Sequence, residues 1–342
     1  MRKKRHVVLA IVAAVVLAVA FAGPSIAAKR QFFAIATGGT GGTYYPLGGV
    51  LAQALNDKIP YIIATAQAAN ASVANCNLIR EHEVESAFVQ NNVAYAAYAG
   101  TSQFEGKPVT NITGIASLYP ETIQIVATVS SGIKTIKDIK GKRLIPGDRG
   151  SGTEVDCLNV LTALGLTYQD FDGVDWLSFS GAAQRLKDKQ GDVAFITAGW
   201  PTSAITELTT TSDVVLVPLD DETIAKLIKM YPFYSKIVIP ANTYKGADKD
   251  VATITTMAQW VVDAQVPTQV VYDLTKALWE KGTFVLRKGS GNTPAEAPSG
   301  AEIMAAAHSK GKDVTLQTAL NGMAIPLHPG AAQFYREKGM IK

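Results

Sequence analysis

The sequence is poor in the residues that build disulfide scaffolds and metal centres. Cys76 and Cys157 are the two cysteines among 342 residues, which is too few for a disulfide framework. They lie far apart in the chain, and we expect two free thiols rather than one bridge. No spacing of His, Cys, Asp and Glu matches a set of metal ligands. The sequence therefore predicts neither a metal ion nor another cofactor.

The chain also lacks an excess of charge of either sign. Four basic residues within positions 2–5 precede the wholly apolar run 7–22, a pattern typical of a secretory signal peptide. We expect residues 1–28 to be this signal, cleaved on export, because the apolar run is short for a retained membrane anchor. Without the four, Lys and Arg fall from 32 to 28 against 29 Asp and Glu. A nearly neutral protein has no basic surface for nucleic acid.

A general base is hard to find in the mature chain. His82 lies at a charged helix end, His308 in a polar segment and His328 in a turn, and we expect all three to be structural or solvated. The G-x-S-x-G elbow of serine hydrolases is absent around Ser151, and Tyr44 stands where a dinucleotide-binding turn needs its third glycine. Many glycines, amides and hydroxyls without a base are suited to holding a ligand. We therefore predict that the protein is not an enzyme.

Glycine, by contrast, is concentrated at two points. The segment 33–46, FAIATGGTGGTYYP, predicts a short buried strand, a turn with four glycines and a helix that opens at Pro46. The N–H groups of Gly41, Gly42 and Thr43 would lie at the positive end of the helix dipole, where a chain binds an oxyanion without a charged side chain. A purely structural connection is the alternative, because glycine-rich loops are common.

The same pattern recurs further along the chain. A short strand at 143–146 leads into the glycine loop 147–152, and a helix follows from Thr153 to Gly165. Two such helix starts could face each other across one crevice and offer N–H groups to the two acid groups of a ligand. Arg149 in the second loop is a candidate bidentate partner for a carboxylate, with an exposed loop arginine as the alternative.

Polar residues follow other expected strands as well. Ser72 and Asn75 lie three residues apart near the start of a helix that Asn70 or Ser72 would cap, so the pair faces the same way. Helix capping alone is the competing explanation for this pair. Further polar or small residues at strand ends are Gln90, Asn91 and Gly199.

Strands and helices alternate through most of the chain, which is typical of parallel sheets flanked by helices. Two long extended runs, 111–130 and 243–262, would carry the chain out of one domain and back into it. The predicted fold is therefore α/β, with two lobes that are each a mainly parallel sheet and with the ligand cleft between them. We expect residues 29–123 and 246–342 in lobe I and residues 124–245 in lobe II.

Taken in order, several motifs resemble the TAXI family of solute receptors, which serve TRAP transporters. The resemblance covers nearly all of the mature chain and rests on segments 37–49, 72–75, 118–121, 138–142, 150–154 and 328–331. It implies the fold of a periplasmic binding protein of type II. It also implies capture of a small organic anion, such as a dicarboxylate, 2-oxoglutarate or glutamate, and its delivery to a membrane permease driven by an ion gradient.

The resemblance also implies a set of ligand-binding residues. We add Arg149 to this set because it brings a positive charge to the second glycine loop. With that addition of Arg149, the expected set is Thr40, Gly41, Gly42, Tyr44, Ser72, Asn75, Gln90, Asn91, Gly150, Ser151, Gly152, Thr153 and Gly199. Cys76, Arg149 and Trp200 depart from what the family leads us to expect. We predict a monomeric receptor whose partners are its ligand and the subunits of a TRAP permease. A secreted ligand-sensing module that presents its bound form to a membrane sensor kinase is the alternative.

Overall fold

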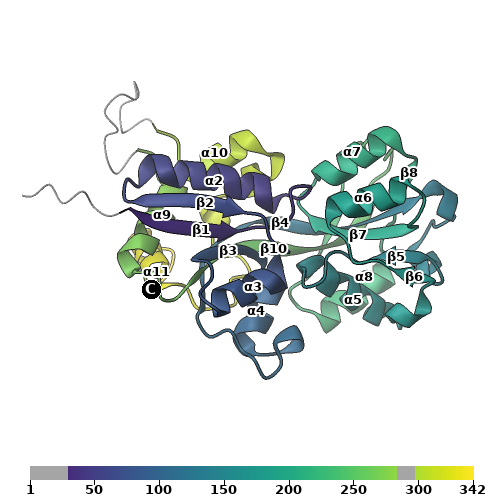
Figure 1. Ribbon diagram of the computed structural model, residues 1–342, viewed down its shortest axis with the longest axis horizontal. Coiled ribbons are helices and arrows are strands. Elements are labelled where there is room, and N and C mark those ends of the chain that lie inside the picture. Colours follow the sequence, from purple (N-terminus) through teal and green to yellow (C-terminus); the bar gives the residue numbers. More distant parts are fainter. Residues whose placement is uncertain (1–29, 283–296) are drawn as a thin grey trace, which may run out of the picture. The chain divides into compact units, whose positions relative to one another are not determined.

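The computed structural model describes residues 30–282 and 297–342, so the predicted signal peptide lies outside the described residues. Ten strands in this part of the chain form one hydrogen-bonded sheet in the order β2-β1-β3-β10-β4-β7-β5-β6, with β8 beside β4 and β9 beside β10 (Figure 1). The strands are β1 Gln31–Ala36, β2 Ile62–Gln67, β3 Ser86–Gln90, β4 Ile112–Thr128, β5 Arg143–Ile145, β6 Gly173–Val174, β7 Val193–Ala198, β8 Val214–Leu216, β9 Ser235–Ile239 and β10 Val251–Asp263.

Helices cover both faces of this sheet (Figure 1). They are α2 Tyr44–Lys58, α3 Ser72–Arg80, α4 Asn91–Ala99, α5 Gly152–Leu164, α6 Phe179–Lys187, α7 Ser203–Thr211, α8 Asp221–Met230, α9 Thr268–Trp279, α10 Gly300–Ala307 and α11 Pro329–Glu337. Within the described ranges, no helix combines the length and the apolar character that a membrane span requires.

The sheet has two parallel parts joined by antiparallel strands. β1 runs parallel to β3, and β5 runs parallel to both β6 and β7. Between these parts, β10 is antiparallel to β3 and β4, and β4 is antiparallel to β7. We call the part built on β1, β2 and β3 the first lobe, and the part built on β5, β6 and β7 the second lobe. The predicted two-lobed α/β fold is confirmed, with parallel strands in each lobe and an antiparallel pair passing through both.

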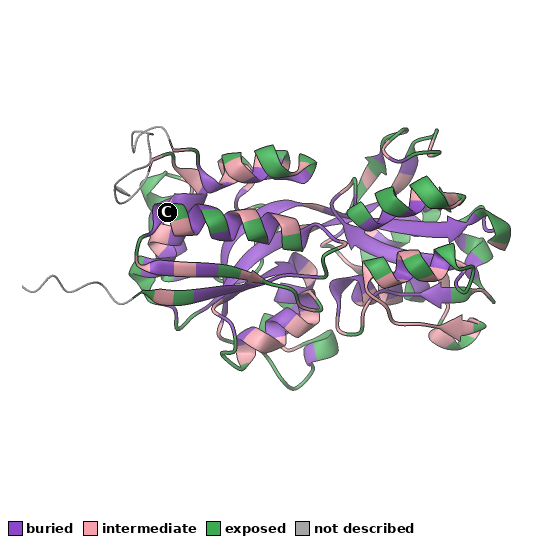
Figure 2. Cartoon of the chain, turned by 45° about the horizontal axis from the view of Figure 1, so that its top comes forward, coloured by how far each residue is buried: buried purple, intermediate pink, exposed green. Residues whose placement is uncertain are grey.

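The strand that leaves the first lobe, β4, is continuous through a proline. Its residues are buried except for Pro120, which is partly exposed, as the colouring of the central strands in Figure 2 illustrates. Pro120 pairs with Met257 of β10, and the register shifts between Met257 and Gln259. A bulge tolerates a proline because the ladder is already interrupted there. The extended run predicted at 111–130 therefore forms one strand and not two.

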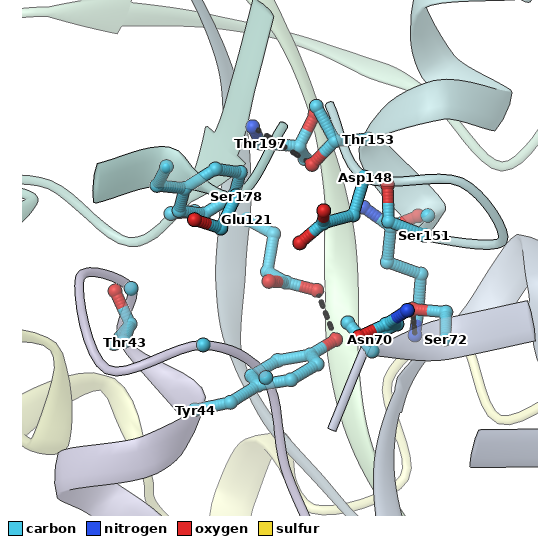
Figure 3. A pocket seen from close by; sticks show the side chains of 18 residues that line it. Thr43, Tyr44, Asn70, Ser72, Glu121, Asp148, Ser151, Thr153, Ser178 and Thr197 are labelled. Carbon is cyan, nitrogen blue, oxygen red and sulfur yellow. Dashed lines mark hydrogen bonds between the residues drawn. The ribbon is translucent and has the colours of Figure 1, made fainter. Parts of the chain in front are cut away.

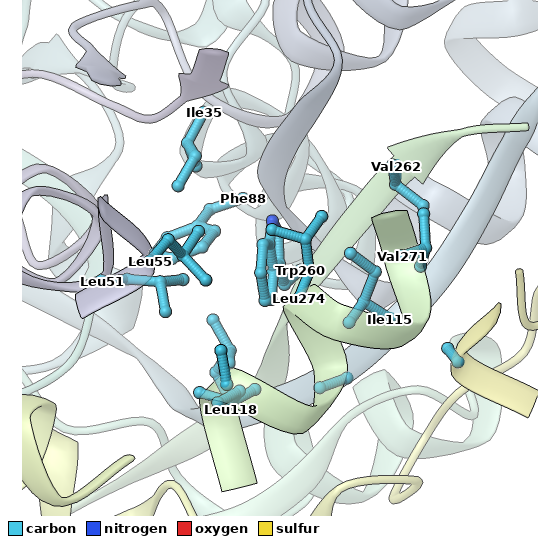
Figure 4. Close-up of a cluster of buried hydrophobic side chains, with 14 of the residues drawn as sticks. Ile35, Leu51, Leu55, Phe88, Ile115, Leu118, Trp260, Val262, Val271 and Leu274 are labelled. Carbon is cyan, nitrogen blue, oxygen red and sulfur yellow. The ribbon is translucent and has the colours of Figure 1, made fainter. Parts of the chain in front are cut away.

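Each lobe has its own hydrophobic core. In the first lobe, helices α2 and α9 pack on the sheet around Trp260, which is fully buried and meets Phe33 edge-to-face at 6.5 Å between ring centroids (Figure 4). In the second lobe, Ile125, Phe195 and Leu227 belong to a separate buried cluster. Strands β4 and β10 pass from one core to the other, since Ile115 and Ala258 belong to the first core and Ile125 and Ile254 to the second.

Two helix starts differ from the sequence prediction. α2 begins at Tyr44, so Pro46 occupies its third position, where the absent N–H group would have lacked an intrahelical acceptor in any case. α3 is preceded by Ala71 with φ of 64°, and no side chain caps it. Ser72 is instead the first residue of the helix, and its Oγ accepts a hydrogen bond from the backbone N–H of Gln90 at 3.0 Å.

Both cysteines are free and buried, as the sequence predicted. Burial raises the pKa of both thiols, those of Cys76 and Cys157, so the reactive thiolate is scarce at neutral pH. We expect a thiol reagent to leave the folded protein unlabelled and to modify two groups per chain after unfolding in denaturant without reductant. Mass spectrometry of the labelled chain makes this measurement. If neither cysteine were labelled after unfolding, the two would instead be joined in a disulfide bridge.

Candidate functional site

A pocket lies between the two lobes and is lined by residues of both (Figure 3). Its wall follows the carboxyl ends of strands, where α/β sheets bind their ligands. It is lined by Gly38, Gly39, Gly42, Thr43, Tyr44, Asn70, Ala71, Ser72, Gln90, Glu121, Asp148, Ser151, Gly152, Thr153, Ser178, Phe179, Thr197 and Ala198.

The first lobe contributes a helix start to this pocket. Gly42 and Thr43 turn the chain from β1 into α2, and Tyr44 is the first residue of that helix. Its first-turn N–H groups have no acceptor within the helix, and they carry the positive end of its dipole. The glycine loop predicted from the sequence thus brings partial positive charge to the pocket without a cationic side chain.

The second lobe contributes two more helix starts. Ser151 caps α5 by accepting a hydrogen bond from the N–H of Glu154 at 3.1 Å, and Gly152 and Thr153 follow at the pocket wall. Ser178 caps α6 in the same way, accepting from the N–H of Gly181 at 3.2 Å. The two glycine loops share one pocket, each at the start of a helix. An oxyanion bound there would meet backbone donors from both lobes.

Acidic groups lie in the same pocket, which the sequence did not predict. Glu121 on β4 is 3% exposed and accepts a hydrogen bond from the hydroxyl of Tyr44 at 2.6 Å. Asp148, in the loop after β5, also points into the pocket (Figure 3). Burial, and then the nearby charge of Asp156, raise the pKa of Glu121 well above its ordinary value, and burial also raises the pKa of Asp148. The described residues that line the pocket include no Lys, Arg or His.

Half of the residues predicted for the site line this pocket. They are Gly42, Tyr44, Ser72, Gln90, Ser151, Gly152 and Thr153. Among them, Gln90 is 2% exposed, and its side-chain oxygen has no hydrogen-bond partner among the described residues. A buried acceptor without a partner costs free energy unless a bound group supplies the donor.

Three of the other predicted residues join the lobes to each other. The carbonyl of Gly41 accepts from the N–H of Ala204 at 3.2 Å, and the carbonyl of Gly150 accepts from the N–H of Ala74 at 3.0 Å. The carbonyl of Gly199 accepts from the hydroxyl of Thr43 at 3.1 Å. These bonds cross from one lobe to the other, so the lobes are in contact in this structure.

The remaining predicted residues lie away from the pocket. Thr40 is exposed. Asn75 is buried and donates to the carbonyls of Thr37 and Phe88 at 2.9 and 2.8 Å, tying α3 to β1 and β3. Asn91 donates to the carbonyl of Gly322 at 3.2 Å.

Arg149 makes a different contact from the predicted one. Its guanidinium carbon lies 3.6 Å from the centroid of the Trp176 ring, a cation–π arrangement. The residue is exposed and does not line the pocket. No cationic side chain of the second glycine loop therefore faces a ligand in this structure.

Sequence reasoning missed Glu121, Asp148, Ser178, Phe179 and Thr197 in the pocket wall. One of them had a signal: Glu121 is the only charged residue in the run 112–128, which is otherwise apolar or uncharged. A carboxyl group in a buried strand demands a partner or a function. The described residues hold no His, Cys, Asp and Glu group arranged to bind a metal ion.

Residues 35–339 match the sequence model of one protein family, the NMT1-like family. The chain belongs to the NMT1-like family. Its fold recurs in solved structures at low sequence identity. One is BugD, a periplasmic binding protein, with a TM-score of 0.54, 12% identity and coverage of 91% of this chain and 98% of that chain. Another is PhnD1 from Prochlorococcus marinus MIT 9301 in complex with methylphosphonate, with a TM-score of 0.51, 9% identity and coverage of 91% and 99%.

The fold of this NMT1-like protein is thus that of periplasmic binding proteins. It agrees with the fold that the resemblance seen in the sequence implies. The narrower assignment to TAXI receptors is not established by the family or the fold and stays a proposal.

Proposed function

We propose that the protein is an extracytoplasmic receptor that captures a small organic acid carrying an amino group, such as glutamate, and delivers it to a membrane permease. The observation that carries this proposal is the mixed electrostatics of the pocket. Helix starts from both lobes face it, while Glu121 and Asp148 project into it without a cationic neighbour among the described residues of the wall. An acid group suits the helix starts, and an ammonium group suits the carboxylates.

A ligand with acid groups alone fits this wall less well. A dicarboxylate such as 2-oxoglutarate would bring negative charge to Glu121, which is buried and accepts a hydrogen bond from Tyr44. It could bind only if Glu121 kept its proton, which the raised pKa permits. An amino acid instead favours the ionised form, because its ammonium group pairs with the carboxylate. The two ligand classes therefore require opposite protonation states of one residue.

This difference gives a pH test with a definite sign. Acidification protonates Glu121, so the affinity for glutamate should fall as the pH decreases, whereas the affinity for a dicarboxylate should rise. We expect glutamate to bind at least about tenfold more tightly than 2-oxoglutarate at neutral pH, since a hydrogen bond to a charged group contributes about 1.5–3 kcal/mol.

Calorimetric titration of protein stripped of ligand by refolding makes the measurement, with both acids run at about pH 5 and about pH 8. The two ligands are matched in length and differ at Cα, which carries an amino group in glutamate and a keto oxygen in 2-oxoglutarate. Tighter binding of 2-oxoglutarate, strengthening on acidification, would overturn the amino-acid proposal but keep the receptor. Silence from both acids, and from methylphosphonate, the ligand seen in PhnD1, would count against small-anion binding altogether.

We also propose how the receptor works in its compartment. Residues 1–28 direct export, and closure of lobe I (29–123 and 246–342) on lobe II (124–245) traps the ligand without chemical change. The core clusters favour a return crossing of β10 near residues 255–257, since Ile254 belongs to the second-lobe core and Ala258 to the first.

The sequence motifs favour a TRAP permease as the partner. A neighbouring gene for an ATPase subunit would point to an ABC transporter instead.

A further inference from the structure

Gln90 lies where the pocket meets the contact between the lobes. It is the last residue of β3, in the first lobe, and it lines the pocket. Its side-chain Nε2 donates to Oδ2 of Asp156 on α5, in the second lobe, at 2.9 Å. The Nε2 end of the carboxamide is therefore hydrogen-bonded across the lobes. The Oε1 end is buried and has no hydrogen-bond partner among the described residues.

Asp156 is a fully buried carboxyl group held by donors from both lobes. The hydroxyl of Tyr234 donates to it from its own lobe, and Asn92 Nδ2 reaches it from the first lobe at 3.4 Å. Burial raises the pKa of Asp156 to about 6, while the bonds from Tyr234 and Gln90 oppose that rise. Three side-chain donors, from Gln90, Asn92 and Tyr234, point to this group, which is the pattern expected around an ionised carboxylate. No Lys, Arg or His of the described residues forms an ion pair with it.

The charge of Asp156 fixes the orientation of the Gln90 side chain. A carboxylate only accepts hydrogen bonds, so Gln90 must turn its amide nitrogen toward Asp156. The oxygen then lies on the other side of the same planar group, against the start of α5, in a residue that lines the pocket. An added Cβ on Gly152 would lie 2.0 Å from this oxygen, which shows how closely the carboxamide packs on the start of α5.

We propose that Gln90 couples ligand binding to lobe closure, its oxygen accepting a hydrogen bond from the ligand while its amide nitrogen holds Asp156 of the other lobe. The proposal rests on the proposed receptor function. When the lobes part, Asp156 is solvated and the carboxamide is free to rotate. When they close, Asp156 orients it, and a ligand with a donor group satisfies the buried oxygen. Gln90 is in this sense a positioning residue that also selects for ligands with a donor.

A double-mutant cycle tests this coupling. Gln90→Met keeps the length of the side chain and removes both hydrogen-bonding ends, and Asp156→Asn keeps the shape but removes the charge. Each change should weaken glutamate binding about tenfold, measured by calorimetry. The double variant should be at most about threefold weaker than either single one, because both changes break the same chain of contacts. Asp156 does not line the pocket, but its charge also raises the pKa of Glu121. A loss of affinity in Asp156→Asn is therefore assigned to closure only where the double variant shows the non-additivity expected here.

The control is a second buried glutamine. Gln259 on β10 is also fully buried, and its Nε2 donates to Ser117 Oγ and the Gly322 carbonyl at 3.1 and 3.0 Å, away from the pocket. Gln259→Met should lower the melting temperature without changing affinity. Unchanged affinity in Asp156→Asn, or losses that simply multiply in the double variant, would overturn the coupling. If a variant fails to fold, Gln90→Glu replaces it, since that change sets two carboxylates against each other and should weaken binding at neutral pH.

A distance measurement separates this inference from the proposed function. Spin labels at Glu105→Cys and Lys229→Cys, both exposed and in different lobes, report closure with or without a ligand. If wild-type protein bound no acid at all, the receptor proposal would fail. The distance between the labels would still test whether Gln90 and Asp156 hold the lobes together. A shift toward longer distances in Gln90→Met supports the lock between Gln90 and Asp156. An unchanged distance distribution in that variant contradicts it.

Discussion

Glu121→Gln should weaken glutamate binding by roughly a hundredfold or more at neutral pH. Glu121 is the buried carboxyl group of the pocket, and in the proposed complex it faces the ammonium group of the ligand. Truncating one partner of a buried charge pair costs about 2–5 kcal/mol, and each 1.4 kcal/mol is about a factor of ten. Calorimetric titration of the variant with glutamate and with 2-oxoglutarate measures the effect.

The comparison between the two acids makes this result specific. Gln cannot ionise, so the variant should bind 2-oxoglutarate no worse than the wild type does, and the pH dependence attributed to Glu121 should disappear. Glu85→Gln is the matched control, because Glu85 accepts the N–H of Ala34 at 2.7 Å and does not line the pocket. Equal losses for both acids in Glu121→Gln would show that the residue supports the pocket without recognising an amino group.

Gly152→Ala should weaken binding about a hundredfold while leaving the protein folded. A Cβ at this position would lie 2.0 Å from Oε1 of Gln90 and 2.8 Å from Oγ of Ser72, so both side chains must move when the lobes close. Gln90 is held by Asp156, and its displacement breaks that bond. Overpacking and a lost charge-assisted hydrogen bond each cost about 1–3 kcal/mol.

The same substitution is favourable for the helix itself. Gly152 is the first residue of α5, where Ala has the higher helix propensity, so the melting temperature without ligand should hold or rise. Gly49→Ala in α2 is the control, because a Cβ there meets nothing within 4 Å. Calorimetry and thermal denaturation of both variants are needed together. Wild-type affinity in Gly152→Ala would mean that the lobes do not close on a ligand as they do in this structure.

The glycine loops were predictable because their signal is local. Four glycines before a helix in the segment 33–46, and a second such loop at 147–152, mark two helix starts whatever surrounds them. Placing both on one pocket needed only the alternation of strands and helices, since such strands direct their carboxyl ends to a common side. Seven predicted residues accordingly lie in the pocket wall.

Tertiary contacts explain the residues that prediction misplaced. Arg149 contacts the ring of Trp176, and Asn75 donates to the carbonyls of Thr37 and Phe88. Neither residue is adjacent in sequence to its partners. Glu121 carried a sequence signal, yet its direction depends on the irregular pairing of β4 with β10. A one-residue shift in register turns a side chain to the opposite face, so a strand pattern alone could not place it.

The central claim is that the pocket between the lobes holds a small acid with an amino group. Mass spectrometry of the compound released from protein purified without refolding tests it most directly, with Gly152→Ala protein prepared in parallel. We predict a small molecule with both an acid and an amino group, present in the wild type and strongly depleted in the variant. A bound compound without an amino group, or the same compound at equal occupancy in both proteins, would contradict the account.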